Sequence, residues 1–325
     1  EQSKKMMEHH HNWYINNSKE NIIYYKYKSI ERNESKVEKS IAVVGGDLRI
    51  VKLIVMLVKD GYTVYTYGLE MSEDLQKIEK IEMCPTVTET VKNSKVVVGP
   101  IPLSSDRKNL SMPFSNIKLN VDEFISCIAG KTLIAGNIVE ETKRKLEQAN
   151  IQYIDLLKRE EFTVLNTIAT AEGTIQIAME ETQKTLHGSK VLIMGFGRIG
   201  KVLAKMLDGI GAKVYCEARK NEDIAWIKAY GYEPIHLNNL NEHLGEFEII
   251  ISTIPFQILD KDRLELVNKD AVIIDLASNP GGVDRKAAKE KDLKLIWALS
   301  LPGKVAPLTS AIYIKETLYH VLKEL

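Results

Sequence analysis

From residue 41 onward, short apolar runs rich in β-branched residues alternate with longer amphipathic stretches. In the first half this pattern predicts strands at "SIAVVG", "TVYTYG", "KVVVGP", "KTLIAG" and "IQYID", with helices that begin near Leu48, Ser72, Val121 and Val139. In the second half it predicts strands at "KVLIMG", "KVYCEA", "EPIHL", "FEIIISTIP", "AVIIDLAS" and "LKLIWALS". Such alternation produces parallel sheets flanked by helices, and six strands are the number in a doubly wound dinucleotide-binding domain.

The same pattern divides the chain into domains. The predicted class is α/β, with two Rossmann-like doubly wound domains joined by a long helix, as in formate/glycerate and alanine dehydrogenase-type proteins. We expect a poorly ordered leader over 1–39 and a flavodoxin- or Rossmann-like substrate-side domain over 40–158. An interdomain helix over 159–188, which ends at a glycine, is expected to lead into an NAD(P)-binding Rossmann domain over 189–303. A C-terminal helix over 304–325 is expected to return to the first domain.

Composition narrows the function classes. The chain has 325 residues, enough for two domains, and its 44 Lys and Arg balance 44 Asp and Glu, which argues against a broadly basic nucleic-acid surface. The three cysteines lack metal-ligand spacing, and the His9–His11 tract has no partners at fixed spacing. Apolar runs are too short and too charged to cross a membrane. The sequence therefore predicts a cytoplasmic protein without a metal centre.

The hexapeptide "GFGRIG" is a GxGxxG sequence, which alone is weak evidence. It follows the strand "KVLIM" directly and opens the helical run "RIGKVLAKMLDGIG", which is the context in which such a loop binds a dinucleotide. Gly195 permits the tight turn, Gly197 lets the backbone approach a pyrophosphate, and Gly200 allows close packing of helix on strand.

The next strand, "GAKVYCEARK", indicates which coenzyme binds. An acidic residue that hydrogen-bonds the ribose of NAD normally ends this strand, but the position falls on Ala218 and is followed by Arg219 and Lys220. Glu217 is one residue early and should point to the other face. A missing carboxylate followed by two cations favours a 2′-phosphate, so we predict NADP rather than NAD. An ordinary solvated strand end is the alternative.

Two later segments end strands at the same edge of the sheet. "STIP" at 252–255 is expected to line the nicotinamide half, and "DLASNPGGVD" at 275–284 is expected to form a wall of the active-site cleft, with plain turn chemistry as the alternative. The predicted cofactor-binding residues are Gly195, Phe196, Gly197, Arg198, Ile199, Gly200, Ala218, Arg219, Lys220, Thr253, Ile254, Pro255 and Ala277.

Seven signatures taken together resemble one family. "GGDLR" at 45–49, "GPIPLSSD" at 99–106, "NTIATAEGT" at 166–174, "GFGRIG", "STIP", "DLASNPGG" and "LPGKVAP" at 301–307 resemble the A subunit of dipicolinate synthase. The resemblance implies oxidation of a dihydro- or tetrahydrodipicolinate-type precursor to dipicolinate, in the mother cell of a sporulating bacterium. It also implies a partner, the flavoprotein-like B subunit of dipicolinate synthase, and a homo-oligomer is left open.

A dicarboxylate substrate needs cationic or N–H donors, and arginine offers the best fork for a carboxylate. Arg49 after "GGD" is the first candidate and Arg107 the weaker one, with an exposed surface position as the alternative for both. The predicted substrate-binding residues are Gly46, Asp47, Arg49, Pro100, Ser104, Thr170, Gly173, Ser278, Pro280 and Gly281.

Glu172 and Lys304 are the catalytic candidates. Glu172 lies in the apolar helical stretch "IATAEGTIQIAM", where burial would tune its pKa for acid or base chemistry; a capping or interdomain hydrogen bond is the alternative. Two positions depart from the family pattern: Ala169 stands where the family has proline, and Leu308 where it has lysine after Pro307. Lys304 is the nearby substitute for that lysine, with a surface lysine as the alternative.

The stretch "IAVVGGDLR" raises the question of a second dinucleotide site. Gly45 and Gly46 follow a strand, but no third glycine stands where the helix must pack, and the next strand lacks a ribose site. We predict an imitation of such a loop on the substrate side, and therefore one coenzyme per chain. Rival functions are a D-2-hydroxyacid, alanine or adenosylhomocysteine-type dehydrogenase, and a non-catalytic NADP-binding subunit of a complex.

Overall fold

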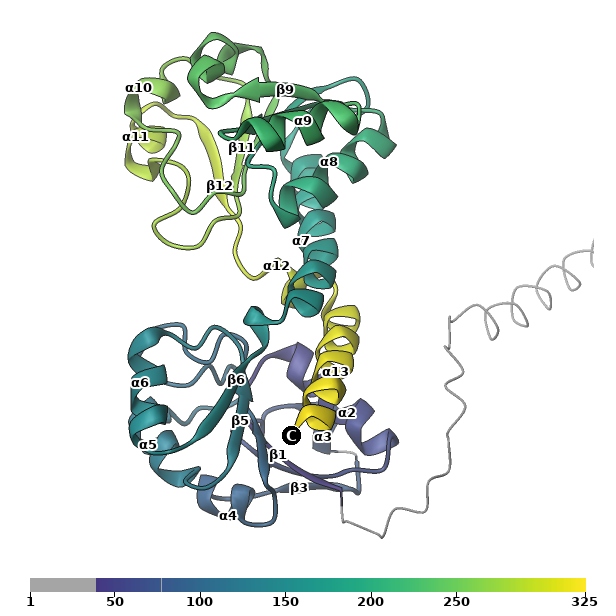
Figure 1. Cartoon of the computed structure of the whole chain (residues 1–325), viewed down its shortest axis with the longest axis vertical. Coiled ribbons are helices and arrows are strands. Elements are labelled where there is room, and N and C mark those ends of the chain that lie inside the picture. Colours follow the sequence, from purple (N-terminus) through teal and green to yellow (C-terminus); the bar gives the residue numbers. More distant parts are fainter. Residues whose placement is uncertain (1–38, 77) are drawn as a thin grey trace, which may run out of the picture. The chain divides into compact units, whose positions relative to one another are not determined.

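The computed structural model describes residues 39–76 and 78–325 (Figure 1). Of the predicted leader over 1–39, all but Lys39 lies outside the described residues, and so does the His9–His11 tract. Within the described ranges, no helix is both long and apolar enough to cross a membrane.

The first half of the chain forms a parallel sheet of six strands in the order β3-β2-β1-β4-β5-β6. Its strands are β1 (Ser40–Val44), β2 (Thr63–Tyr67), β3 (Ile81–Met83), β4 (Val96–Val98), β5 (Thr132–Ala135) and β6 (Gln152–Asp155). Its helices are α2 (Leu48–Lys59), α3 (Glu73–Gln76), α4 (Val87–Lys92), α5 (Val121–Cys127) and α6 (Glu140–Gln148). Strand β3 was not predicted, because its three residues are too few to show a periodic pattern.

The second half forms another parallel sheet of six strands, in the order β12-β11-β10-β7-β8-β9. Its strands are β7 (Lys190–Met194), β8 (Lys213–Ala218), β9 (Glu233–His236), β10 (Ile249–Ser252), β11 (Val272–Asp275) and β12 (Lys294–Trp297). Its helices are α8 (Arg198–Ile210), α9 (Asn221–Ala229), α10 (Lys261–Leu264) and α11 (Arg285–Glu290). Both sheets have the doubly wound 3-2-1-4-5-6 order, so the predicted α/β class with two Rossmann-like domains is confirmed.

Each sheet is apolar on both faces, which explains why its central strands are unbroken apolar runs. In β1, Ile41 and Val43 pack into the cluster formed with α2, while Ala42 and Val44 face the opposite cluster with α4 and α5. This alternation follows from the two-residue period of a strand.

Helix α7 (Glu160–Glu181) links the two halves of the chain. It ends at Glu181 and not at the predicted Gly188, which lies in a turn before β7. It packs against α8, α12 (Leu301–Val305) and α13 (Pro307–Glu324). At Gly173, a Cβ atom would lie 3.1 and 3.2 Å from the two γ carbons of Val305. The glycine therefore brings α12 close to α7.

Helix α13 lies beside α2 (Figure 1). Ala311, Ile314, Leu318 and Val321 form its buried stripe, which belongs to the same cluster as Ile41 of β1. At the edge of this contact, Asp60 accepts hydrogen bonds from the Tyr319 hydroxyl at 2.6 Å and the Lys315 ammonium at 2.8 Å. In addition, Nη1 and Nη2 of Arg159 donate hydrogen bonds to the two carboxylate oxygens of Glu324, at 2.7 and 2.8 Å. The last helix thus completes the core of the first sheet.

Candidate functional site

The turn after β7 has the geometry of a dinucleotide loop. Gly195 adopts a φ of +93°, and a Cβ at Gly200 would lie 2.1 Å from the Gly195 carbonyl oxygen, so α8 packs on the turn as only glycine allows. Gly197 is exposed, and a Cβ there would meet nothing within 4 Å. The backbone at Gly197 and the first turn of α8 are therefore accessible, and their amide groups could bind a pyrophosphate.

The other predicted residues of this loop have different surroundings. Phe196 is buried and packs near Tyr230 and Tyr232, with ring centroids 6.1 and 6.4 Å away. Arg198 is exposed, and its Nη1 donates to Glu160 at 2.9 Å and to the Thr163 hydroxyl at 2.7 Å. Ile199 packs partly buried in the core of the second sheet. Arg198 thus already has partners on α7.

At the end of β8, Ala218 is buried while Arg219 and Lys220 are exposed. Glu217 is 1% exposed, and its Oε2 has no hydrogen-bond partner among the described residues. Burial raises the pKa of Glu217 to about 7; the Gly195 amide and the charges of Arg263 and Arg219 oppose that rise. Glu217 is therefore buried, whereas Arg219 and Lys220, which follow it in the sequence, are exposed to solvent.

The segments after β10 and β11 are fastened to each other at the carboxyl edge of the second sheet. The amides of Ile258 and Leu259 both donate to the Gly282 carbonyl oxygen, at 2.9 and 3.0 Å. Buried Asp275 accepts the amides of Ala277 at 3.1 Å and Gly282 at 2.9 Å. These bonds hold the "DLASNPGG" turn in a fixed position.

Thr253, Ile254 and Pro255 follow β10, which neighbours β7. A Cβ at Gly195 would lie 2.7 Å from both the Thr253 hydroxyl oxygen and an Ile254 side-chain carbon. The glycine loop and the "STIP" segment thus meet where the strand order reverses, which is where doubly wound folds bind nucleotides.

Unlike the turn after β7, the turn after β1 is covered by another segment of the chain, residues 111–112. The Gly46 amide donates to the Ser111 carbonyl oxygen at 3.0 Å. A Cβ at Gly45 or at Gly68 would lie 2.6 Å from side-chain atoms of Met112. Both Gly45 and Gly46 are buried. The space that a pyrophosphate would need is occupied by residues 111–112.

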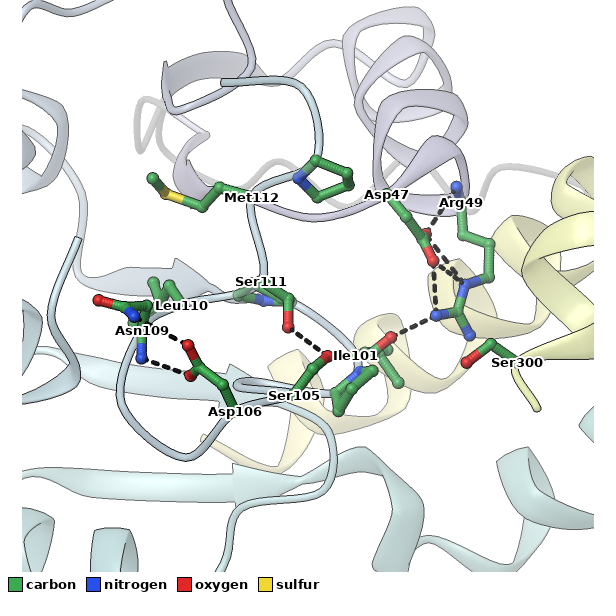
Figure 2. Close-up of a pocket in the computed structure, with 13 residues that line it drawn as sticks. Asp47, Arg49, Ile101, Ser105, Asp106, Asn109, Leu110, Ser111, Met112 and Ser300 are labelled. Atoms are coloured by element: carbon green, nitrogen blue, oxygen red, sulfur yellow. Dashed lines mark hydrogen bonds and ion pairs between the residues drawn. The ribbon is translucent and has the colours of Figure 1, made fainter. Parts of the chain in front are cut away.

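Beside this filled turn lies a cavity of about 450 Å³ (Figure 2). Its volume lies in the usual range of small-molecule sites, about 300–1,000 Å³. The lining residues are Asp47, Arg49, Pro100, Ile101, Pro102, Ser105, Asp106, Asn109, Leu110, Ser111, Met112, Pro113 and Ser300. Residues 47 and 100–102 follow β1 and β4, so the cavity lies at the strand-order reversal of the first sheet.

Arg49 is the cation of this cavity, and it is 5% exposed. Its Nε and Nη2 donate to the Asp47 carboxylate at 2.8–3.0 Å, and its Nη2 also donates to the Ile101 carbonyl oxygen. Asp47 is the N-cap of α2 as well, since it accepts the Arg49 amide at 3.0 Å. Among the described residues no hydrogen bond uses Nη1 of Arg49, so this nitrogen is left for a ligand.

The loop at the opposite end of the cavity is shaped by Asp106. Its carboxylate accepts the amides of Lys108 and Asn109 at 2.8 and 2.7 Å, the Asn109 side chain at 2.8 Å and the Ser104 hydroxyl at 3.1 Å. Hydrogen bonds from Asn109, and then from Lys108, hold the pKa of the Asp106 carboxyl well below its usual range. Ser104 therefore supports the loop and is not among the residues that line the cavity.

Of the predicted substrate-binding residues, the cavity brings together Asp47, Arg49 and Pro100. The others lie elsewhere: Gly46 within the filled turn, Thr170 and Gly173 on α7, and Ser278, Pro280 and Gly281 in the turn after β11. Glu172 is exposed on α7, and Lys304 is exposed on α12. The predicted burial of Glu172 is therefore wrong. The apolar residues around it in the sequence lie on the buried faces of α7, and Glu172 lies on the exposed face. Arg107 is exposed at the loop tip with a φ of +64°.

Five further residues line the cavity without having been predicted from the sequence: Ser105, Asn109, Ser111, Met112 and Ser300. One signal was available for part of this set, because an aspartate whose side chain binds amides two and three residues later is typical turn chemistry and "DRKN" offers it. In the described part of the chain, no cluster of three or more His, Cys, Asp and Glu side chains is placed to hold a metal ion.

Comparison with known families gives two matches. Residues 40–157 match the N-terminal domain of the A subunit of dipicolinate synthase. Residues 155–288 match the NAD-binding domain of the D-isomer specific 2-hydroxyacid dehydrogenases. The second sheet therefore belongs to an NAD(P)-binding domain.

Individual relatives agree with these matches. The dipicolinate synthase A subunit of Bacillus subtilis (strain 168) is 31% identical over 294 residues, which cover 88% of this chain and 96% of the relative. The crystal structure of the dipicolinate synthase A subunit from Bacillus halodurans superposes with a TM-score of 0.79 at 26% identity, covering 88% of this chain and 98% of that one. An L-alanine dehydrogenase, at 17% identity and a TM-score of 0.59 over 87% of this chain and 89% of that one, shares the fold alone.

The filled turn after β1 leads to a prediction about stoichiometry. Titration calorimetry with NADP(H) should give one binding site per chain, because Ser111 and Met112 occupy the first turn. Gly197→Asp should abolish that binding, since it places a carboxylate in the open space without disturbing a neighbour. Two sites in the wild type, or binding that survives in Gly197→Asp, would contradict the assignment.

Glu217 leads to a prediction about pH. Its pKa in the folded protein, about 7, lies above its ordinary value of 4.5, so the folded state holds a proton that the unfolded state loses. The free energy of unfolding should therefore fall as the pH rises from about 4.5 through 7, by on the order of 3 kcal/mol. Denaturant titrations should show this fall in the wild type relative to Glu217→Gln. Parallel pH profiles for the two proteins would refute the assignment.

Proposed function

Because the chain belongs to the family of the dipicolinate synthase A subunit, we propose that it oxidises a dihydro- or tetrahydropyridine-2,6-dicarboxylate to dipicolinate with NADP. The observation that carries the proposal is the buried Arg49, whose Nη1 has no hydrogen-bond partner among the described residues. It lies in a cavity of the same chain that presents an open dinucleotide loop. A carboxylate-binding cation and a coenzyme loop are the two parts that such a reaction needs.

The preference for NADP is supported by the end of β8. Ala218 offers no carboxylate to hydrogen-bond the ribose hydroxyls of NAD. Arg219 and Lys220 are exposed directly after it, where a 2′-phosphate would find two cations. Glu217 does not supply the missing carboxylate, since it is buried below the surface that these cations share.

The residues that would hold the coenzyme are Gly195, Gly197 and Gly200 with the first turn of α8, Thr253 to Pro255, and Arg219 with Lys220. A bound nicotinamide ring supplies a hydride acceptor. At the dihydropyridine level the substrate loses one hydride from a ring carbon and one proton, and its ring becomes aromatic; a tetrahydropyridine loses one pair more.

The gain of aromaticity means that the protein needs to orient the substrate and keep water away more than to supply a strong base. Arg49 suits the first task because Asp47 and the Ile101 carbonyl oxygen fix its guanidinium. The apolar walls Pro100, Leu110 and Met112 suit the second. Neither Glu172 nor Lys304 is required in this scheme.

Two parts of the proposal rest on the family alone. These are partnership with a flavoprotein-like B subunit, and action in the mother-cell cytoplasm of a sporulating bacterium, where dipicolinate is made. Met179 on α7 and Leu308 and Ile312 on α13 are exposed apolar side chains, and they are candidate contacts for such a partner.

The function is tested by assaying the purified chain with an enzymatically generated precursor and NADP⁺, in the presence and absence of the flavoprotein-like partner. We expect dipicolinate and NADPH to appear together in the ratio that the precursor's oxidation level requires. Gly197→Asp should remove the coenzyme-dependent rate and leave only the spontaneous oxidation seen without NADP⁺. Dipicolinate formed without NADPH, at a rate unchanged in Gly197→Asp, would mean that the chain is a non-catalytic member of a complex.

The coenzyme preference is tested by Arg219→Ala. Removal of one exposed phosphate contact should weaken NADP binding about tenfold, since a charged hydrogen bond contributes roughly 1.5–3 kcal/mol, and should leave NAD binding nearly unchanged. Lys213→Ala removes a cation at the opposite end of the same strand and serves as the matched control. Equal loss for both coenzymes, or wild-type preference for NAD, would contradict the NADP assignment.

A further inference from the structure

We propose that Ser300 is a substrate-binding residue, whose hydroxyl receives one carboxylate of the substrate together with Nη1 of Arg49. The inference rests on the proposed function and specifies how its cavity holds the dicarboxylate. Ser300 lies between β12 and α12, directly before the "LPGKVAP" segment, and lines the cavity.

The backbone of Ser300 has a conformation that serine rarely adopts. Its φ is +59° and its ψ is +31°, in the left-handed region that disfavours residues other than glycine. Serine at the N-cap of a helix normally bonds its hydroxyl to the helix amides, but Ser300 makes no such bond to α12. The backbone of Ser300 is therefore strained, and its hydroxyl is available to bind a ligand. Backbone strain of this kind is common at ligand-binding sites.

Arg49 and Ser300 lie at the same end of the cavity (Figure 2). Nε and Nη2 of Arg49 are bound to Asp47, and Nη2 is bound to the Ile101 carbonyl oxygen as well. The remaining Nη1 belongs to the side of the guanidinium that faces Ser300 in Figure 2. A fixed guanidinium N–H and a neighbouring hydroxyl are two donors for the two oxygens of one carboxylate.

Gly303 holds the two donors together. A Cβ at Gly303 would lie 3.0 Å from Oδ2 of Asp47 and 3.2 Å from Nε of Arg49. The backbone of α12 therefore rests directly against the Asp47–Arg49 pair. Ser300 precedes this point of contact by less than one helical turn, so its position relative to Arg49 is set by that contact.

The rest of the lining indicates which class of carboxylate fits. Pro100, Pro102, Leu110 and Met112 give flat or apolar walls, which suit the face of a ring. Arg49 is ion-paired with Asp47 at 2.8 Å, and the lining residues include no other Lys or Arg, so the cavity offers one guanidinium to a single carboxylate. The pair thus favours a ring-borne carboxylate over a long flexible dicarboxylate.

The test measures binding of pyridine-2,6-dicarboxylate by calorimetry to the full chain with saturating NADP⁺. Ser300→Ala removes the hydroxyl and keeps the backbone strain, whereas Ser300→Gly removes both. We expect the dissociation constant of the dicarboxylate to rise about tenfold in each variant, and the dissociation constant of NADP⁺ to stay unchanged. Ser126→Ala, at an exposed serine on α5, should bind both ligands like the wild type.

Three outcomes would overturn the inference. If both Ser300 variants bind the dicarboxylate like the wild type, the hydroxyl has no role, and the proposed function stands. If only Ser300→Ala binds weakly, Ser300 matters through its backbone conformation and not as a donor. If the wild type with bound NADP⁺ does not bind the dicarboxylate at all, the substrate assigned under the proposed function fails together with this inference.

Discussion

The close approach of a helix to the turn that precedes it is the constraint on which both halves of this molecule depend. At the turn after β7 the approach is so close that a Cβ at Gly200 would lie 2.1 Å from a carbonyl oxygen. At the turn after β1 the corresponding crowding falls on Gly46, where a Cβ would lie 2.5 Å from the Ile50 side chain. Both turns thus need glycine, but only the turn after β7 leaves its outer face open. Only the turn after β7 therefore has room for a dinucleotide, because Ser111 and Met112 cover the turn after β1.

Much of the fold could be predicted from the sequence because its central strands are apolar on both faces and helices such as α2 and α8 carry a clear apolar stripe. The parallel sheets and the glycine loop at 195–200 follow from local patterns of this kind. Strand β3 could not, because three residues at a sheet edge carry no period. The distinction between Gly45 and Gly195 was visible as a missing third glycine and a missing ribose site on the next strand. The residue that fills the first turn, Met112, lies far along the chain, so its role could not be predicted.

The candidate site was harder to predict, since it is assembled from segments that meet only in the folded chain. Asp47 and Arg49 could be found because a carboxylate substrate requires a cation near a strand end. Ser300 could not, since its signal is a left-handed backbone and not a residue type. Glu172 shows the opposite error: an apolar neighbourhood in sequence suggested burial, but a helix has a second face, and Glu172 lies on it.

The attachment of α13 to the first sheet has a consequence for how the chain is made. Ile314, Leu318 and Val321 pack in one cluster with Ile41 and Val43 of the first described strand. During synthesis on the ribosome, the first sheet emerges before α13, so it lacks this apolar cover until α13 has been made. The second sheet has no such dependence on α13 in its clusters. The first sheet is therefore translated first, but its apolar core is complete only after the second sheet and α13 have been translated.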